Sequence, residues 1–320
     1  MKEEEIRPKQ LFGEYLKLSI KDGNSLNKKL FVEIDCQVCK SPLRKILITK
    51  YEYTYKQCEE CRSVLCSPRP SEKQLSQLYF NSESSRFWSE VFFPSVAEAR
   101  KEKLFTPKAQ QIASLIHDRK LNINSICDIG AGHGVFLEEL KRFLPDAKLY
   151  AIEPDSSSAS ECRKKGIETL EEVSENAHIW NGKFDMVISS EVIEHVFDVA
   201  SFIRSLHSLL KPNGVALITG LGYEGFDILT LGEKSNSISP PHHLNFLSLE
   251  GFHKVFKNND FRIVDVWTPG KLDVDIVINS GLENEFVNTL KSRGEIAIQD
   301  FQDFLVKHKL SSHVWVLAQK

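Results

Sequence analysis

Two pairs of cysteines have the spacing of a metal site. Cys36 and Cys39 form one C-x-x-C unit, and Cys58 and Cys61 form a second. Four thiolates close a tetrahedron around zinc and leave no open position for catalysis. The spacing therefore predicts a structural Zn²⁺ ion, the alternative being two pairs of ordinary reduced cysteines.

A glycine-rich segment, DIGAGHG, indicates a ligand loop. Asp128, Gly130 and Gly132 lie in it, after an apolar run and before a helical pattern. Glycine lets the backbone turn sharply and approach a ligand closely. Val135 occupies the position of the last glycine of a dinucleotide fingerprint, which disfavours a pyrophosphate cradle and a NAD-dependent dehydrogenase. Glu153 ends the next apolar run, where a carboxylate can accept both ribose hydroxyls, so the two features together predict a nucleoside ligand.

Two adjacent histidines, His242 and His243, are candidate general bases. They lie in PPHHLNF, after a Gly- and Ser-rich segment over 221–241 that suits a lid. Histidine can take a proton from an acceptor near neutral pH. Neighbouring side chains point in different directions, so we expect one of the two, His243, to face the site. The alternative is that both brace the helix that follows.

A third cluster, Glu191-x-x-Glu194-His195, follows the apolar run FDMVISS. Two carboxylates and an imidazole on one turn offer hard oxygen ligands and a nitrogen, a set that suits a divalent ion. The alternative is that the segment shapes a ligand pocket without metal.

The elements that carry these residues alternate between strands and helices from Ile123 onward. The apolar runs SICDIG, KLYAIE, FDMVISS and GVALITG predict strands, and helical patterns separate them. Asp198 is the expected N-cap of one such helix, and residues 211–214 (KPNG) end it. This alternation predicts an α/β, Rossmann-like fold, with a mainly parallel sheet covered on both faces.

The remainder of the chain divides into segments of different composition and residue pattern. We expect a solvated N-terminal arm over 1–35, a zinc-binding knuckle with a hairpin at LITKYEYTY over 36–70, and a helical linker over 71–120. Residues 121–320 form the predicted catalytic domain, with an insertion at 270–311 that shapes a pocket or a dimer contact.

Composition narrows the class of protein. The chain has 320 residues, 41% hydrophobic and 27% charged, which excludes a disordered or fibrous protein. Its formal net charge of −3 provides no positive field, so we expect neither a nucleic-acid partner nor a membrane. The charged start MKEEEIRPKQ lacks an apolar signal segment, from which we expect a cytoplasmic protein.

Residues 120–270 resemble class I S-adenosylmethionine (SAM)-dependent methyltransferases. The resemblance rests on four motifs that occur in the order and spacing of that family: DIGAGHG, AIEPD, FDMVISSEVIEHV and LLKPNG. The resemblance implies a seven-stranded sheet with one antiparallel strand, supplied by HVWVLAQK. It also implies that Asp128, Gly130 and Gly132 line the methionyl part of the cofactor, that Glu153 binds its ribose, and that Glu191 shapes the cofactor pocket. Residues 170–172 (LEE) give no clean match to the acidic residue beside adenine.

Two finer resemblances lead to different functions. The cysteine module followed by PRPS is similar to that of sugar methyltransferases of deoxysugar and surface-polysaccharide pathways. ExxEH resembles the metal-binding motif of ubiquinone-pathway O-methyltransferases and small-RNA 2′-O-methyltransferases, in which His242 or His243 would be the further ligand.

The sequence thus predicts a methyltransferase that uses SAM, carries a structural zinc and acts on a small molecule, for which we expect a sugar or sugar nucleotide and a histidine base. The first alternative is a metal-assisted O-methyltransferase of a phenol or RNA hydroxyl that uses Glu191, Glu194 and His195. The second is a SAM-binding adaptor without catalysis. O-, N- and C-methylation share the cofactor half, which leaves the acceptor atom open.

Overall fold

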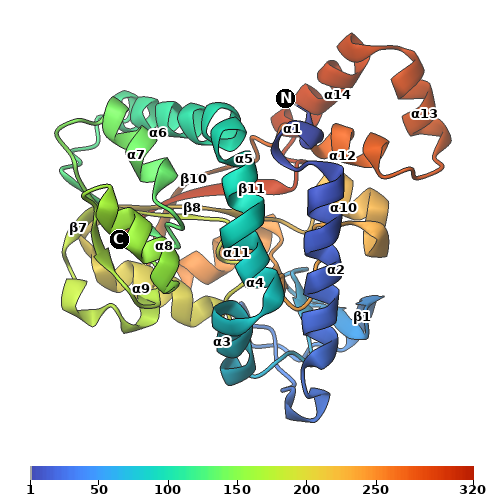
Figure 1. Cartoon of the computed structure of the whole chain (residues 1–320), viewed down its shortest axis with the longest axis horizontal. Coiled ribbons are helices and arrows are strands. Elements are labelled where there is room, and N and C mark those ends of the chain that lie inside the picture. Colours follow the sequence, from blue (N-terminus) through green and yellow to red (C-terminus); the bar gives the residue numbers. More distant parts are fainter. Residues whose placement is uncertain (1) are drawn as a thin grey trace.

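A seven-stranded sheet runs through the centre of the computed structural model, which describes residues 2–320 (Figure 1). The strand order is β10-β11-β8-β7-β4-β5-β6, and β11 is the one strand of this sheet antiparallel to its neighbours among the described residues. The strands are β4 (Ser125–Ile129), β5 (Lys148–Ile152), β6 (Glu168–Leu170), β7 (Phe184–Ser190), β8 (Leu210–Leu221), β10 (Arg262–Trp267) and β11 (His313–Gln319). The predicted Rossmann-like sheet, including its antiparallel C-terminal strand, is confirmed.

Helices cover both faces of this sheet, as its continuously apolar strands require. Residues of α6, α7 and α8 share one buried cluster with the sheet, and residues of α9 and α11 share the other. Asp198 caps α9 by accepting a hydrogen bond from the Ser201 amide at 2.9 Å, as predicted. The bounds are α6 (Thr106–Asp118), α7 (Val135–Phe143), α8 (Ser156–Lys164), α9 (Val199–Leu209) and α11 (Leu249–Lys257), with short 3₁₀ turns η4 (Ser174–Asn176) and η5 (His178–Trp180) before β7.

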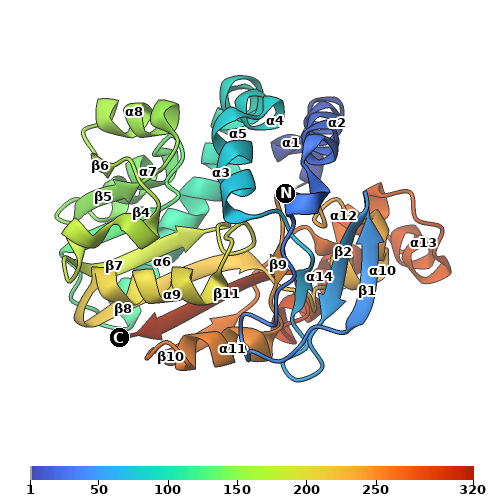
Figure 2. The ribbon, with the colours of Figure 1, turned by 90° about the horizontal axis from the view of Figure 1, so that it is seen from below.

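A second, four-stranded sheet lies beside the first (Figure 2). Its order is β1-β2-β3-β9, formed by β1 (Lys45–Lys50), β2 (Tyr53–Gln57), β3 (Val64–Cys66) and β9 (Asn245–Phe246). The hairpin predicted in LITKYEYTY is β1–β2, whose turn residues Tyr51 and Glu52 both have positive φ (49° and 64°), the geometry of a tight hairpin turn. Because β9 comes from the segment after β8, the cysteine module and the catalytic domain share a sheet.

Residues 2–35 are not the predicted solvated arm. They form α1 (Glu3–Ile6), α2 (Lys9–Ser25) and the turn η1 (Lys28–Leu30). The Tyr53 hydroxyl donates to the Gly23 carbonyl at 2.9 Å, and a Cβ on Gly23 would lie 2.9 Å from Cδ of Pro241. The prediction of an arm was wrong because α2 is polar on average and buries only one narrow face, which is recognisable once its partners are in place.

Residues 72–118 are almost wholly helical, and α3 to α5 form a column from which α6 runs in a different direction (Figure 1). From α4 to α6 the backbone stays helical through two π-helical turns, η2 and η3, while Pro94 and Pro107 lie in the first turns of α5 and α6, where proline is tolerated. The column consists of α3 (Glu72–Asn81), α4 (Glu83–Phe87), η2 (Trp88–Phe92) and α5 (Phe93–Arg100), and η3 (Lys101–Phe105) leads from it to α6.

The C-terminal insertion contributes three helices between β10 and β11, namely α12 (Asp273–Asn279), α13 (Glu285–Ser292) and α14 (Glu295–Lys307). Two shorter elements, α10 (Phe226–Leu231) and η6 (Gly232–Lys234), follow β8, and α10 packs against α12. The short α1 connects this insertion to the helical column, because the Glu3 amide donates to Asp275 at 2.7 Å while Lys103 pairs with Glu5. Among the described helices, none is long and apolar enough to cross a membrane.

Candidate active site

The glycine loop joins the end of β4 to α7 and forms a backbone cradle. Gly130 and Gly132 have φ of 72° and 54°, in the left-handed region that glycine adopts without strain. A Cβ on Gly130 would lie 2.7 Å from Cγ2 of Val192, whereas the space in front of Gly132 is open to 4 Å. Glycine is therefore needed at 130 for packing, and at 132 its missing side chain leaves room beside the backbone.

Two buried carboxyl groups border this loop. Asp128 ends β4 and is 3% exposed, and its Oδ1 has no hydrogen-bond partner among residues 2–320. Glu153 follows β5 and accepts from the amides of Gly132 at 2.7 Å and Asp155 at 2.9 Å. Burial raises the pKa of each to about 7, against an opposing effect of Lys108 on Asp128. Both retain acceptor capacity for the hydroxyl or ammonium donors of a ligand.

Glu191 lies where β7 ends, next to β4 in the sheet. Its φ of 54° is unusual for a residue with a side chain. The Thr219 hydroxyl donates to Oε1 at 2.8 Å, and Nδ1 of His313 lies 3.4 Å from Oε2. Burial favours the protonated form of Glu191, but His313 and Lys108 outweigh it and hold the pKa of this carboxyl well below its ordinary value. Glu191 is thus a fixed anion between the glycine loop and the residues described next.

Glu194, His195 and His243 converge beyond the end of β7. One ligand atom from each lies within 4.8 Å of the others, and Oε2 of Glu194 is buried without a partner among residues 2–320. Nδ1 of His195 lies 3.0 Å from the His242 carbonyl, and Nδ1 of His243 lies 2.6 Å from the Ser237 carbonyl. Because a carbonyl can only accept, each Nδ1 carries the proton and each Nε2 keeps a free lone pair. Burial lowers the pKa of His243 to about 4, so its ring is neutral at pH 7.

The two adjacent histidines face different surroundings, as expected from their position in sequence. His242 is 4% exposed and points toward the N-terminal helices, with Nε2 3.2 Å from the Ser84 hydroxyl and its ring centroid 6.1 Å from that of Tyr15. His243 instead joins Glu194 and His195. The structure thus brings only one member of the pair, His243, into the cluster.

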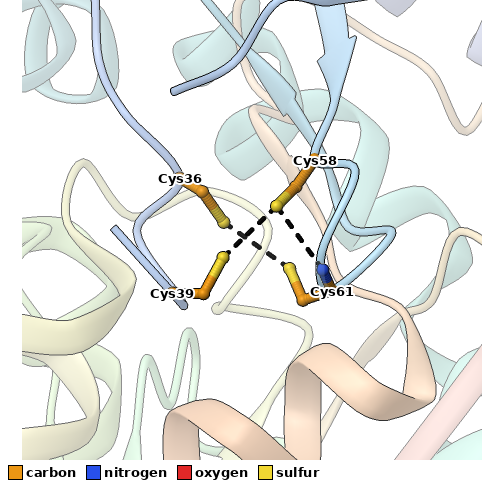
Figure 3. Close-up of side chains that lie close together, drawn as sticks. All are labelled: Cys36, Cys39, Cys58 and Cys61. Carbon is orange, nitrogen blue, oxygen red and sulfur yellow. Dashed lines mark hydrogen bonds between the residues drawn. The ribbon is translucent and has the colours of Figure 1, made fainter. Parts of the chain in front are cut away.

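The four cysteines of the two C-x-x-C units converge on one point (Figure 3). Sγ of Cys36 lies 3.5 Å from Sγ of Cys61, and Sγ of Cys39 lies 3.3 Å from Sγ of Cys58. A disulfide needs roughly 2.05 Å between its sulfurs, so these are not disulfides. Four sulfurs bound to one zinc at about 2.3 Å would be separated from each other by distances close to those observed here. The donor set therefore fits Zn²⁺, in a module that packs on α9 and α11 away from the glycine loop.

The geometry, a glycine loop with an acidic residue at each of two neighbouring strand ends, agrees with the comparison to known families. Residues 92–266, more than half of the chain, match the family described as a methyltransferase domain. This chain belongs to that family. The prediction of a class I SAM-dependent methyltransferase is confirmed at this level.

Curated relatives of this methyltransferase include ubiquinone biosynthesis O-methyltransferases. The protein from Bradyrhizobium diazoefficiens is 28% identical over 119 residues, which cover 33% of this chain and 44% of the relative. The mitochondrial protein from Homo sapiens is 35% identical over 107 residues, or 29% of this chain and 28% of the relative. The match thus spans less than half the length of each relative.

Solved structures resemble the methyltransferase in fold. The plantazolicin methyltransferase BamL, crystallised with a triazolic desmethylPZN analog and SAH, superposes with a TM-score of 0.51 at 14% identity. That comparison covers 77% of this chain and 94% of the other. At this identity the likeness establishes the fold alone.

Sequence reasoning missed two side chains that the methyltransferase fold places at this site. Nζ of Lys108 in α6 lies 2.6 Å from the Ser190 hydroxyl and 3.2 Å from that of Thr219, and His313 begins β11 beside Glu191. Lys108 had a signal: it precedes Ile112 by one helical turn on the apolar face, where a charged residue is uncommon. His313 had none, because only strand pairing brings it to Glu191.

Proposed function

We propose that the chain is a SAM-dependent O-methyltransferase that acts on a hydroxyl of a small-molecule acceptor. The observation that carries this proposal is the cluster of buried Glu194 with half-buried His195 and His243, next to a glycine loop with unfilled ligand groups. The relatives named above are O-methyltransferases, which agrees with an oxygen acceptor. Asp128, Gly130, Gly132 and Glu153 are the proposed cofactor contacts, and Glu191 separates them from the acceptor.

The chemistry asks the protein for alignment and for one proton acceptor. SAM, when bound, supplies a methyl group on a sulfonium, which becomes a neutral thioether as the carbon–sulfur bond breaks. The acceptor oxygen forms the new bond to carbon and loses its proton to Nε2 of His243. The Ser237 carbonyl holds the opposite ring nitrogen, so the ring is oriented with its lone pair available.

A label-transfer experiment tests this function. The purified chain receives methyl-labelled SAM together with a cell extract separated into small molecules, RNA and protein. We expect label in the small-molecule fraction, in a product whose methyl group is ether-linked. Label confined to protein or RNA would contradict a small-molecule acceptor. SAM binding without any transfer would favour the alternative of a non-catalytic adaptor.

A second candidate is metal-assisted O-methylation, which the free Nε2 atoms of His195 and His243 and the unpartnered Oε2 of Glu194 favour. These three groups would hold a divalent cation, which would lower the pKa of the acceptor hydroxyl. Backbone carbonyls orient both rings through Nδ1, the arrangement common around histidine ligands. Loss of activity in a strong chelator, and its return with Mg²⁺, Mn²⁺ or Zn²⁺, would support this candidate. Full activity in chelator, with the four-cysteine site still loaded, would exclude it.

Two finer proposals concern the acceptor class and the cysteine module. A sugar or sugar nucleotide is our proposed acceptor, supported by the resemblance of the sequence to sugar methyltransferases; identification of the labelled product decides between it and a phenol. Structural Zn²⁺ at Cys36, Cys39, Cys58 and Cys61 is supported by the converging sulfurs. We expect one equivalent of zinc by elemental analysis, and its loss, together with lower thermal stability, in Cys58→Ser.

A further inference from the structure

Two arginines near the proposed acceptor site have buried N–H groups without a hydrogen-bond partner among residues 2–320. Arg7 follows α1, and Arg100 ends α5. Nε of Arg7, and Nε and Nη1 of Arg100, are buried and have no hydrogen-bond partner within residues 2–320. A guanidinium cannot lose its proton at physiological pH, and a buried donor without an acceptor costs stability. A pair of such groups therefore indicates a binding site for an external acceptor of hydrogen bonds.

Aromatic rings hold the two guanidiniums without using their N–H groups. Cζ of Arg100 lies 5.9 Å from the ring centroids of both Trp88 and Phe105, and Cζ of Arg7 lies 5.5 Å from that of Phe12. Contact through the flat face orients a guanidinium and leaves the donors on its edge free. Free edges of this kind match the paired oxygens of a carboxylate or a phosphate.

The two arginines lie near each other and near the proposed base. Helix α1 packs against α5 (Figure 1). Burial, together with the charge of Arg7, lowers the pKa of Arg100 to about 10 against the opposing effect of Glu191. Glu191 does not neutralise them, because its oxygens face Thr219 and His313. Like charges brought together in this way are stabilised by an anion between them.

The glycine loop has a different cation beside it. Lys108, in α6, faces the sheet end that carries Ser190, and its charge acts directly on Asp128. Arg100 precedes Lys108 by eight positions and is a separate cation. Burial lowers the pKa of His243 and Arg7 lowers it too, so Arg7 lies near the proposed base, and we place the arginine pair on the acceptor side of Glu191.

We infer that Arg7 and Arg100 bind an anionic group of the acceptor, a carboxylate or a phosphate, and so position its hydroxyl at His243. This inference deepens the proposed function and rests on it. It restricts the substrate to acidic small molecules, and it gives the segment after α1 a role, because Arg7 supplies one of the two cations.

Anion binding to the SAH-loaded 320-residue chain tests the inference. Sodium phosphate and sodium acetate are titrated separately at constant ionic strength, with NaCl as the reference, while calorimetry reports binding. Each titration is repeated with Arg100→Gln, Arg7→Gln, the charge-preserving Arg100→Lys, and Arg86→Gln, an exposed arginine of α4. SAH affinity and thermal unfolding are measured for every variant, which shows whether it is folded.

We expect saturable binding of at least one anion, weakened tenfold or more in Arg100→Gln and Arg7→Gln, partly restored in Arg100→Lys and unchanged in Arg86→Gln. A response to phosphate alone identifies a phosphorylated acceptor, and one to acetate alone identifies a carboxylic acid. Absence of saturable binding in the wild-type chain, or binding by both glutamine variants with the affinity of the wild type, would overturn the inference. The inference would also be overturned if both glutamine variants lost SAH affinity and the anion competed with SAH. The arginines would then bind the cofactor's carboxylate instead of the acceptor. Failure of the wild-type chain to bind SAH would instead refute the proposed function, and titration without SAH would still test the arginines.

Discussion

The proposed cofactor half and the proposed acceptor half of the site are built from different materials. The cofactor half consists of backbone amides, glycines and two carboxylates at the ends of adjacent parallel strands, β4 and β5. The acceptor half consists of side chains from the segment after α1, the helical column, the loops after β7 and β8, and the start of β11. The first half is part of the sheet itself, whereas the second exists only after distant segments have docked.

This difference predicts that the two halves can be damaged separately. A backbone cradle within a sheet resists side-chain changes elsewhere, since its shape is fixed by strand register and hydrogen bonds. A cluster of side chains depends on every element that supplies a member. Cofactor binding should therefore survive changes that abolish transfer.

The largest expected effect comes from the base. His243→Ala should lower kcat about 100-fold or more, the typical contribution of general-base catalysis, while the Kd of SAH stays within about twofold. Calorimetry and steady-state kinetics measure the two quantities. His242→Ala is the matched control and should have the smaller effect on kcat. Full turnover in both variants would remove the base assignment.

Disrupting the docking of the acceptor half should cost stability. Arg69 is fully buried and donates to the carbonyls of Cys66 at 2.9 Å and Phe197 at 2.8 Å, and to Oδ1 of Asn245 at 3.0 Å. Arg69→Leu leaves these acceptors unpaired, so the free energy of unfolding should fall by about 3 kcal/mol. Chemical denaturation measures the loss. An unchanged denaturation midpoint would show that the small sheet and the segment after β8 are held together elsewhere.

Glu153→Ala should act on the cofactor half alone. Loss of a charged hydrogen-bond acceptor should weaken SAH binding by about 1.5–3 kcal/mol, or roughly ten- to a hundredfold. At saturating SAM, kcat should be much less affected than in His243→Ala. Unchanged SAH affinity would argue against Glu153 as the ribose contact and against the division into two halves.

The smallest effect is expected from Tyr79, a positioning residue. Its hydroxyl donates to the His242 carbonyl at 3.1 Å and lies 3.2 Å from Nδ1 of His195. Tyr79→Phe removes one neutral hydrogen bond, which is worth about 1 kcal/mol, so kcat should fall about fivefold with SAH affinity unchanged. A pH–rate profile compared with that of the wild type separates an effect on the histidines from a general loss of folding.

Local spacing was enough to predict much of the fold and the positions of the residues proposed to bind the cofactor. The glycine loop, Glu153, the cap at Asp198 and the two C-x-x-C units each depend on residues close in sequence, or on consecutive strands whose ends meet at one sheet edge. The antiparallel position of residues 313–319 came with the family resemblance. By contrast, helix α2 was missed, because a polar segment shows its buried face only against its partners.

The sequence by itself determined which groups are present: a glycine loop after a strand, four cysteines in two C-x-x-C units, and a set of histidines and glutamates. Tertiary structure alone decided that His243 rather than His242 joins Glu194 and His195, that His313 pairs with Glu191, and that Arg7 lies near Arg100. The physical reason is the separation in sequence between the residues that interact. Hydrogen bonds in a turn or a cap follow from neighbouring residues, whereas burial and charge pairing depend on which distant surfaces pack together.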